Sequence, residues 1–322
     1  MMQLFLLFIL AHLVSDFVIQ TDVLVKRKKV YWRKIKLSKG LTEHVLHHIM
    51  ITFLLVFSLY GFDLSSIPPI IIIGCIHYFI DFFTGEYSER LIKKCREKND
   101  RERTIFHHLL TKRTFYFAID QMFHLLTIYL VLFMFNKIES MNLLIQSAVD
   151  LYRYDAVFDI RTKMILLCIL VILLIFASGY LINKILLDIK KEDENELAAA
   201  LEQDEPLFSD MKKIDKNVTV EQAWERTEGT TKRSLKIHYH DFLEPELDRA
   251  GKYIGFLERF LIGLFIILEM VPGLALLATL KTIARFKQFE SKAFAEYYLI
   301  GTLLSFSLGI CWSLLIKFVL QL

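Results

Sequence analysis

Residues 2–22 read MQLFLLFILAHLVSDFVIQTD, an apolar run that is interrupted only by a few polar side chains, among them His12, Asp16 and Gln20. An apolar run of about 20 residues is what one α-helix needs to cross the hydrocarbon core of a bilayer. Asp16 and Gln20 are four residues apart, so at about 3.6 residues per turn we expect them on one face of that helix. The stretch therefore predicts a membrane-spanning helix with a polar stripe.

The same spacing of four recurs in the next three apolar stretches. The pairs are His44 with His48, His77 with Asp81, and Asp120 with His124. An ionised aspartate at the centre of a spanning helix is unfavourable by roughly 2.5–3.5 kcal/mol, so isolated polar side chains are not expected there. One interior cluster that all four pairs face is the simplest arrangement that lowers this cost.

The composition agrees with a chain that is built mainly of membrane spans. Hydrophobic residues make up 54% of its 322 residues, and the mean hydropathy is +0.41. We predict an all-α integral membrane protein, a polytopic bundle of about seven hydrophobic helices with a small cytoplasmic insertion. The expected helices cover about residues 2–22, 41–60, 67–84, 114–135, 163–187, 254–280 and 295–319.

The pattern divides the chain into four parts. Residues 1–135 form a four-helix membrane bundle with the His/Asp cluster, and residues 136–187 an external amphipathic loop and a fifth helix. Residues 188–250 form a polar cytoplasmic insertion that we expect to be partly helical. Residues 251–322 form a C-terminal membrane hairpin.

Two basic loops give the predicted topology. Residues 26–39 contain eight basic and no acidic residues, and residues 85–113 contain nine Lys and Arg. By the positive-inside rule both loops are cytoplasmic and the N-terminus lies outside, which brings all four pairs to a similar depth near the cytoplasmic side. We expect these loops to contact anionic lipid headgroups, and we favour this over nucleic-acid binding.

The topology of residues 251–322 stays open at this stage. If both last apolar runs cross simply, the basic linker between them lies outside, against the positive-inside rule. A broken or re-entrant segment at Glu269, Pro272 and Gly273 is the alternative, because irregular backbone is tolerated where protein covers it.

Imidazole and carboxylate together are the ligands of zinc, manganese and non-haem iron. We predict a divalent metal, zinc first and manganese or iron as alternatives, with ligands among His44, His48, His77, Asp81, Asp120 and His124. Asp16, Asp81 and Asp120 are the candidates for a general base, and His12, Gln20 and Gln121 for groups that orient the others. His47 lies off the His44–His48 face and is expected outside the site. The surplus of ligands leaves room for a water, a general base or a second metal.

Hydrolysis is the chemistry that this set favours, because a divalent metal lowers the pKa of a bound water to about 7. Two other functions use the same residues. The pairs could be helix-to-helix hydrogen bonds in a membrane sensor or assembly component without enzymatic activity, or a proton path in a proton-coupled transporter. No inverted repeat is evident, which makes transport the weaker hypothesis. A homo-oligomer is compatible with all three.

Four stretches, AHLVSDFVIQTD, HVLHH, IHYFID and AIDQMFHLL, resemble the N-terminal membrane domain of a bacterial family of unknown function, domain of unknown function 3307. GKYIGFLERFLIGLF, IARFK and AEYYLIGTLLSF resemble the tail of its longer members. The resemblance covers about the first 135 and the last 70 residues. It implies a multi-pass protein of the bacterial inner membrane and names no activity.

More distantly, the pairs are similar to families of membrane-bound metal-dependent hydrolases. This second resemblance implies metal-dependent hydrolysis and identifies no substrate. For a membrane-embedded site we expect a lipid or lipid-linked substrate at the cytoplasmic side. The positions that map onto the motifs are His12, Asp16, Gln20, His44, His48, His77, Asp81, Asp120, Gln121 and His124.

Overall fold

The computed structural model describes residues 2–21, 24, 28, 39–97, 112–138, 158–189, 218–227, 230–239, 245–286, 289 and 292–321. The central parts of both basic loops and residues 139–157 and 190–217 lie outside this description, and with them the predicted lipid contacts and external loop. The chain divides into two units, one of residues 1–188 with 255–322 and one of residues 189–254.

Six helices in the described part of the chain are long and apolar enough to cross a membrane. They are α1 with its continuation η1 (Met2–Leu13 and Val14–Ile19), α3 (Lys39–Leu59), the short η2 with the first part of α4 (Leu64–Ser66 and Ile67–Glu97), α6 (Arg113–Met134), α8 with its continuation to Ile189 (Ile160–Ile172, then η3, Leu173–Ala177), and α13 (Lys292–Gln321). A shorter apolar helix, α12 (Val271–Ala284), adds to them. The predicted all-α membrane fold with about seven hydrophobic helices is thus confirmed.

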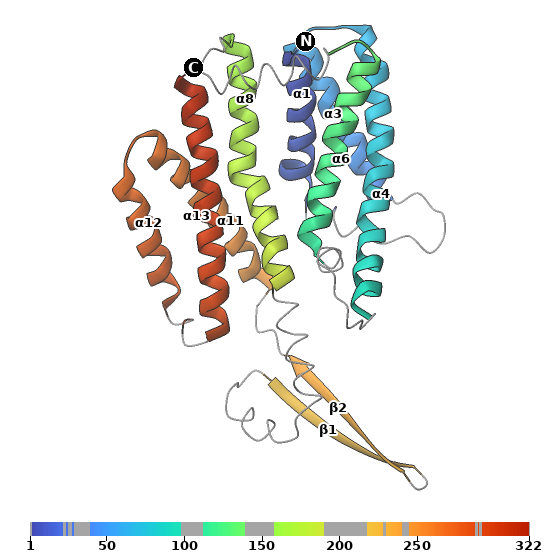
Figure 1. Cartoon of the computed structure of the whole chain (residues 1–322), viewed down its shortest axis with the longest axis vertical. Helices are drawn as coiled ribbons and strands as arrows, with labels where there is room; N and C mark the ends of the chain where they lie inside the picture. The colour runs from blue at the N-terminus through green and yellow to red at the C-terminus, as the bar shows by residue number, and fades with distance from the viewer. Residues whose placement is uncertain are drawn as a thin grey trace. The chain divides into compact units, whose positions relative to one another are not determined.

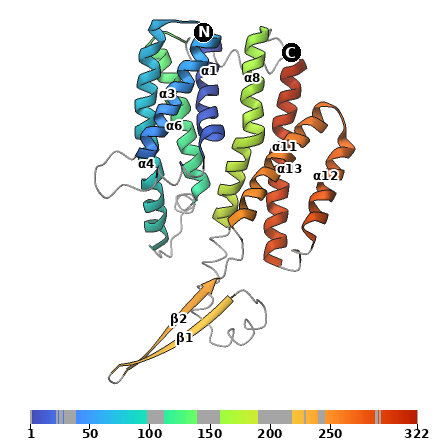
Figure 2. The same cartoon turned by 180° about the vertical axis from the view of Figure 1, so that it is seen from behind.

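Helix α1 is the central element of the N-terminal bundle. It packs against α3, α6 and α8, and α4 packs between α3 and α6. Figures 1 and 2 show α1 between α8 and the group formed by α3, α4 and α6. Leu4, Leu7 and Phe8 of α1 are almost fully buried, because a helix that is apolar on every side can be surrounded by other helices.

Two local features bring the polar pairs together. Gly74 lets α3 and α4 approach closely, since a Cβ atom built there would lie 2.5 Å from Cγ1 of Ile49. Helix α1 ends in the π-helical turn η1, which contains Asp16 and stops at Ile19. Such turns inside helices are frequent at functional sites.

The expectation that Asp16 and Gln20 share one helix face is wrong. The helix ends before Gln20, whose backbone is extended with φ −67° and ψ 100°. The side chain of Gln20 is therefore not stacked one turn below Asp16, and its amide oxygen accepts a hydrogen bond from Lys28 Nζ at 3.2 Å.

Asp188 lies near the C-terminal end of the continuation of α8, and its side chain caps the N-terminus of α6. Its carboxylate accepts hydrogen bonds from the backbone N–H of Arg113 at 2.8 Å and of Thr114 at 2.9 Å. The first N–H groups of a helix have no partner within the helix, so this contact satisfies two of them and ties α6 to the continuation of α8.

The helix expected over residues 254–280 is interrupted between Ile267 and Val271, in the part of the chain whose topology the sequence left open. Helix α11 (Pro245–Ile267) and α12 are joined by a turn in which Glu269 has a positive φ of 60°. The 14 residues of α12 extend over about 21 Å, less than the roughly 30 Å of a bilayer core. Lys281, near the end of α12, binds Glu258 of α11 at 2.7 Å. The two helices therefore form a hairpin that turns back on itself, as Figures 1 and 2 show.

The second unit contains an antiparallel hairpin of two strands. β1 (Val218–Thr227) pairs with β2 (Thr230–Tyr239) in continuous register, from Val218 opposite Tyr239 to Thr227 opposite Thr230. Their four threonines and other β-branched or aromatic residues favour extended backbone. Helix α11 begins at Pro245, within the same predicted insertion, so the insertion contains both helix and strand.

Candidate metal centre

Four helices bring eight polar side chains to one place inside the N-terminal bundle. They are His12 and Asp16 from α1 and η1, His44 and His48 from α3, His77 and Asp81 from α4, and Asp120 and His124 from α6. The five histidines are 1–6% exposed, and the side chains of Asp81 and Asp120 are 13% and 19% exposed. The structure therefore brings together the paired residues that the sequence singled out. Gln20 is the exception, because it is linked to the cluster only through its hydrogen bond with Lys28.

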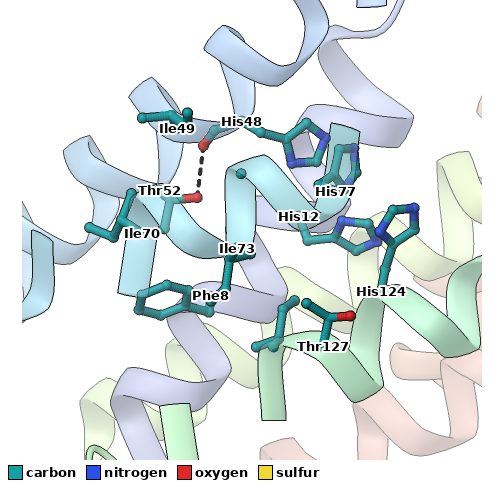
Figure 3. A pocket seen from close by; sticks show the side chains of 12 residues that line it. Phe8, His12, His48, Ile49, Thr52, Ile70, Ile73, His77, His124 and Thr127 are labelled. Atoms are coloured by element: carbon teal, nitrogen blue, oxygen red, sulfur yellow. Dashed lines mark hydrogen bonds between the residues drawn. The ribbon is translucent and has the colours of Figure 1, made fainter. Parts of the chain in front are cut away.

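The imidazole rings lie close together across the helix interfaces, in tilted pairs. The ring centres of His48 and His77 are 3.8 Å apart, and those of His77 and His124 are 4.1 Å apart. Figure 3 shows these three rings and that of His12 gathered at one end of a small cavity.

One group of ligand atoms surrounds the Asp16 carboxylate, and we call it the Asp16 set: Asp16, His44, His48 and His77. Asp16 Oδ1 lies 2.8 Å from Nε2 of His48, 3.2 Å from that of His44 and 3.9 Å from that of His77. The Nε2 atoms of His44 and His77 are 3.2 Å apart. Metal bonds of 2.0–2.1 Å in a tetrahedron put ligand atoms about 3.3 Å apart, so these spacings suit a zinc-sized ion.

A second group, the Asp81 set, consists of Asp81, Asp120 and His124. His124 Nε2 lies 3.3 Å from Asp81 Oδ1 and 3.5 Å from Asp120 Oδ1. The other oxygen of Asp81, Oδ2, lies 3.4 Å from His44 Nε2 and 3.6 Å from His77 Nε2. The Asp81 carboxylate thus faces both sets, one with each oxygen.

Amide and hydroxyl groups hold the carboxylates in place. Gln121 Nε2 donates to Asp16 Oδ2 at 3.3 Å and to Asp120 Oδ2 at 3.2 Å, and its oxygen lies 3.3 Å from His12 Nε2. Thr84 Oγ1 donates to Asp120 Oδ1 at 2.6 Å. Partners of this kind orient metal ligands and fix their charge state.

Lys28 is the member of the site that the sequence did not indicate. Its ammonium group donates to Asp81 Oδ2 at 2.8 Å and to Gln20 Oε1 at 3.2 Å. The residue belongs to a run of eight basic residues that reads as a topology signal, and nothing in its neighbours marks it apart. A lysine side chain is long enough to carry its charged group to partners some distance from its own backbone.

Within the described part of the chain, three buried imidazole nitrogens have no hydrogen-bond partner: Nδ1 of His44 and Nε2 of His124 in the cluster, and Nδ1 of His47 outside it. A buried polar atom without a partner calls for an explanation, and a bound ion or water is the usual one. With neutral imidazoles, the three aspartates and Lys28 leave the cluster with two negative charges. This net negative charge attracts divalent cations, so the residues present fit a metal site.

A narrow cavity adjoins the histidines on the side of Phe8, Ile73 and Thr127. Its volume is about 20 Å³, measured as the space open to the centre of a water molecule. One water needs roughly 10–15 Å³ by this measure, so the cavity has room for one beside the imidazoles.

His47 takes part in no ion pair or ligand group among the described residues, as its position off the His44–His48 face predicts. It is half-buried on the same helix, which makes it a matched control for the site histidines.

No curated protein and no solved structure matches the chain. Residues 4–152 match the model of a family described as Protein of unknown function (DUF3307). This segment contains all eight side chains of the cluster together with Lys28, Thr84 and Gln121. It is the part of the chain that resembles this family, and the resemblance predicted from the sequence is confirmed there.

Proposed function

We propose that the protein is a metal-dependent intramembrane hydrolase that acts on a lipid or lipid-linked substrate. The observation that carries the proposal is the Asp16 set, in which three imidazole nitrogens and one carboxylate oxygen approach one another at metal-ligand spacing inside a bundle of apolar helices. Ionisable groups inside a membrane are costly and are usually retained for function.

Zinc is the ion that this set suits best, because three imidazoles with one open position for water is its usual catalytic arrangement, with Asp16 beside that water rather than bound to the ion. His44, His48 and His77 would hold the ion. When bound, zinc acidifies a water and polarises the bond to be cleaved.

The protein's own groups then move the protons. Asp16 is the carboxylate in position to take one proton from the attacking water, while the water oxygen forms a bond to the acyl carbon or phosphorus of the substrate. The bond from that atom to the leaving oxygen breaks, and the leaving oxygen takes up the proton from Asp16. Gln121 keeps Asp16 turned toward the histidines through its hydrogen bond to Oδ2.

The setting supports a lipid substrate. The cluster lies within helices that are long and apolar enough to cross a bilayer. We place the protein in the bacterial inner membrane with the N-terminus outside and both basic loops and residues 188–250 in the cytoplasm. The hairpin of α11 and α12 supports this orientation, because the basic linker after α12 then starts on the side where α11 begins, in agreement with the positive-inside rule. Anionic lipids at the basic loops are the expected partners.

The test uses purified full-length protein with vesicles made from a bacterial polar lipid extract, and mass spectrometry to detect released headgroups or acyl chains. We expect product formation that stops after chelation and returns with zinc. Asp16→Asn should keep the metal and lower the rate by about 10²–10⁴-fold, the usual contribution of a general base. A His47→Ala control should match the wild type.

The rivals give different results in the same experiment. A purely structural cluster predicts no product from any lipid, and a loss of stability in detergent on Asp16→Asn. A proton-coupled transporter predicts pH-dependent flux without bound metal. Either outcome would reject the hydrolase.

A further inference from the structure

We propose that the Asp81 set binds a second divalent cation next to the first, with the Asp81 carboxylate bridging the two. This inference rests on the proposed function in one respect, since it takes the Asp16 set as the first metal site. It goes further by giving Asp81, Asp120 and His124 an ion of their own.

The geometry of His124 is the first reason. Its Nε2 atom is buried and makes no hydrogen bond among the described residues, although two carboxylate oxygens lie only 3.3 and 3.5 Å away. The nitrogen is therefore aimed at the space between Asp81 and Asp120 without forming a well-directed contact to either. A cation in that space gives all three groups a partner.

The position of Asp81 is the second reason. Its Oδ1 faces His124 and its Oδ2 faces His44 and His77 of the Asp16 set. A carboxylate that presents one oxygen to each of two ligand groups is suited to bridge two ions, and two-metal centres hold their ions about 3.5–4 Å apart.

The third reason is that hydrogen-bond donors orient the carboxylates of this set. The Lys28 ammonium binds Asp81 Oδ2 at 2.8 Å, and the neighbouring carboxylate of Asp120 is held by Thr84 and Gln121. Both groups that hold Asp120 are hydrogen-bond donors, and they orient its two oxygens. These hydrogen bonds hold the carboxylates of Asp81 and Asp120 in an orientation in which they can bind a cation.

The ligand types indicate which cation this would be. Two carboxylates and one imidazole form a harder, more oxygen-rich set than the three imidazoles around Asp16. Carboxylate and water ligands suit magnesium and manganese, whereas imidazole suits zinc. We therefore assign to the Asp81 set a hard divalent cation, for which Mn²⁺ is a spectroscopic probe.

The experiment is metal loading of the full-length protein in detergent. All metal is removed with a chelator, Mn²⁺ alone is added back, unbound ion is removed, and bound manganese is counted by elemental analysis. Electron paramagnetic resonance then distinguishes an isolated Mn²⁺ ion from two exchange-coupled ions. We expect about two equivalents and a coupled spectrum.

Variants separate the two positions. Asp120→Asn should leave one equivalent with the six-line signal of an isolated ion, and Asp81→Asn should abolish the coupling. Thr84→Val keeps every ligand and removes the hydroxyl that bonds Asp120 Oδ1 and the carbonyl oxygen of Ile80, so it should weaken the second binding step by about 10–100-fold. It keeps the test informative if an aspartate variant does not fold. His47→Ala should bind like the wild type.

One equivalent at saturating Mn²⁺ that Asp120→Asn leaves in place, or two equivalents without coupling, would overturn the second site. The outcome is independent of turnover. Two coupled ions without hydrolysis of any lipid would keep this inference and reject the proposed function. Zinc-dependent hydrolysis by a protein that binds a single equivalent of metal would keep the proposed function and reject this inference.

Discussion

The Lys28 ammonium group and the Asp81 carboxylate are 2.8 Å apart, although 53 residues separate them in the chain. The contact joins a basic loop to the centre of the His/Asp cluster. A cation in the cluster and the lysine would both be attracted to Asp81, so the two are expected to compete.

Replacing Lys28 tests this competition. Lys28→Met removes the positive charge, so the affinity of the cluster for a divalent cation should rise, by a factor on the order of 5–150 if the coupling has the usual size. Titration with Zn²⁺ in a calorimeter measures it. Lys39→Met, at an exposed lysine that opens α3, should leave the affinity unchanged. An unchanged or lower affinity in Lys28→Met would show that the lysine does not oppose the ion.

Gly74 should be required for the close approach of α3 and α4. A methyl group there would lie 2.5 Å from Ile49 Cγ1, so Gly74→Ala forces the helices or the Ile49 side chain to move. We expect a loss of stability of about 1–3 kcal/mol, as for other overpacked sites, together with weaker metal binding, because His48 and His77 lie on these two helices. Thermal unfolding in detergent measures the first effect.

Gly301→Ala is the control for this substitution. Its added methyl group would lie 3.4 Å from Leu186 Cδ1, an ordinary contact in another pair of helices. The variant should be as stable as the wild type or slightly more, since alanine favours helix over glycine. Equal effects of the two substitutions would argue against a special role for Gly74.

Asp188 should contribute to stability without affecting the metal. Asp188→Ala removes the acceptor for the N–H groups of Arg113 and Thr114 at the start of α6. A lost helix cap costs about 0.5–2 kcal/mol, which should appear as a lower unfolding temperature in detergent. The metal content should stay at the wild-type value. A loss of metal in this variant would mean that the cap and the cluster are coupled.

The contact between Asp63 and Lys137 predicts a pH dependence. The Lys137 ammonium, and then Ser65, hold the pKa of the Asp63 carboxyl well below its usual value. A carboxyl whose pKa is depressed in the folded state stabilises the fold above its unfolded pKa, about 3.9, and loses that contribution as the pH falls toward the folded value.

The corresponding measurement compares wild type and Asp63→Asn at two pH values. The difference in unfolding temperature should be present at pH 6 and shrink as the pH falls below about 4. The double variant Asp63→Asn/Lys137→Met should have an unfolding temperature no lower than that of the less stable single variant. A difference that stays constant with pH would assign the effect of Asp63 to its cap of Ser65 rather than to its charge.

The sequence was sufficient to predict the spans and the core of the cluster. His44, His48, His77, Asp81, Asp120 and His124 sit in regular helix, where a spacing of four places two side chains on one face whatever the neighbours are. A polar pair in each of four apolar stretches then leaves one shared interior as the place where they can meet.

Other features depend on contacts between segments that are distant in the sequence, and the sequence pattern does not show such contacts. Gln20 lies beyond the end of η1, and a π-helical turn has no clear sequence signature. Lys28 reaches Asp81 only because the fold brings its loop there. The break between α11 and α12 was visible as Glu269, Pro272 and Gly273, but the direction of the following helix depends on packing, including the contact of Lys281 with Glu258.

Elemental analysis of the purified protein tests the central claim most directly. Inductively coupled plasma mass spectrometry would compare the wild type, His47→Ala, and a variant with His48→Ala and His77→Ala. The account predicts about one equivalent or more of zinc, manganese or iron in the first two proteins and its loss in the third. No metal in the wild type, even after reconstitution with added ions, would contradict it and leave the cluster as hydrogen bonds between helices or a proton path.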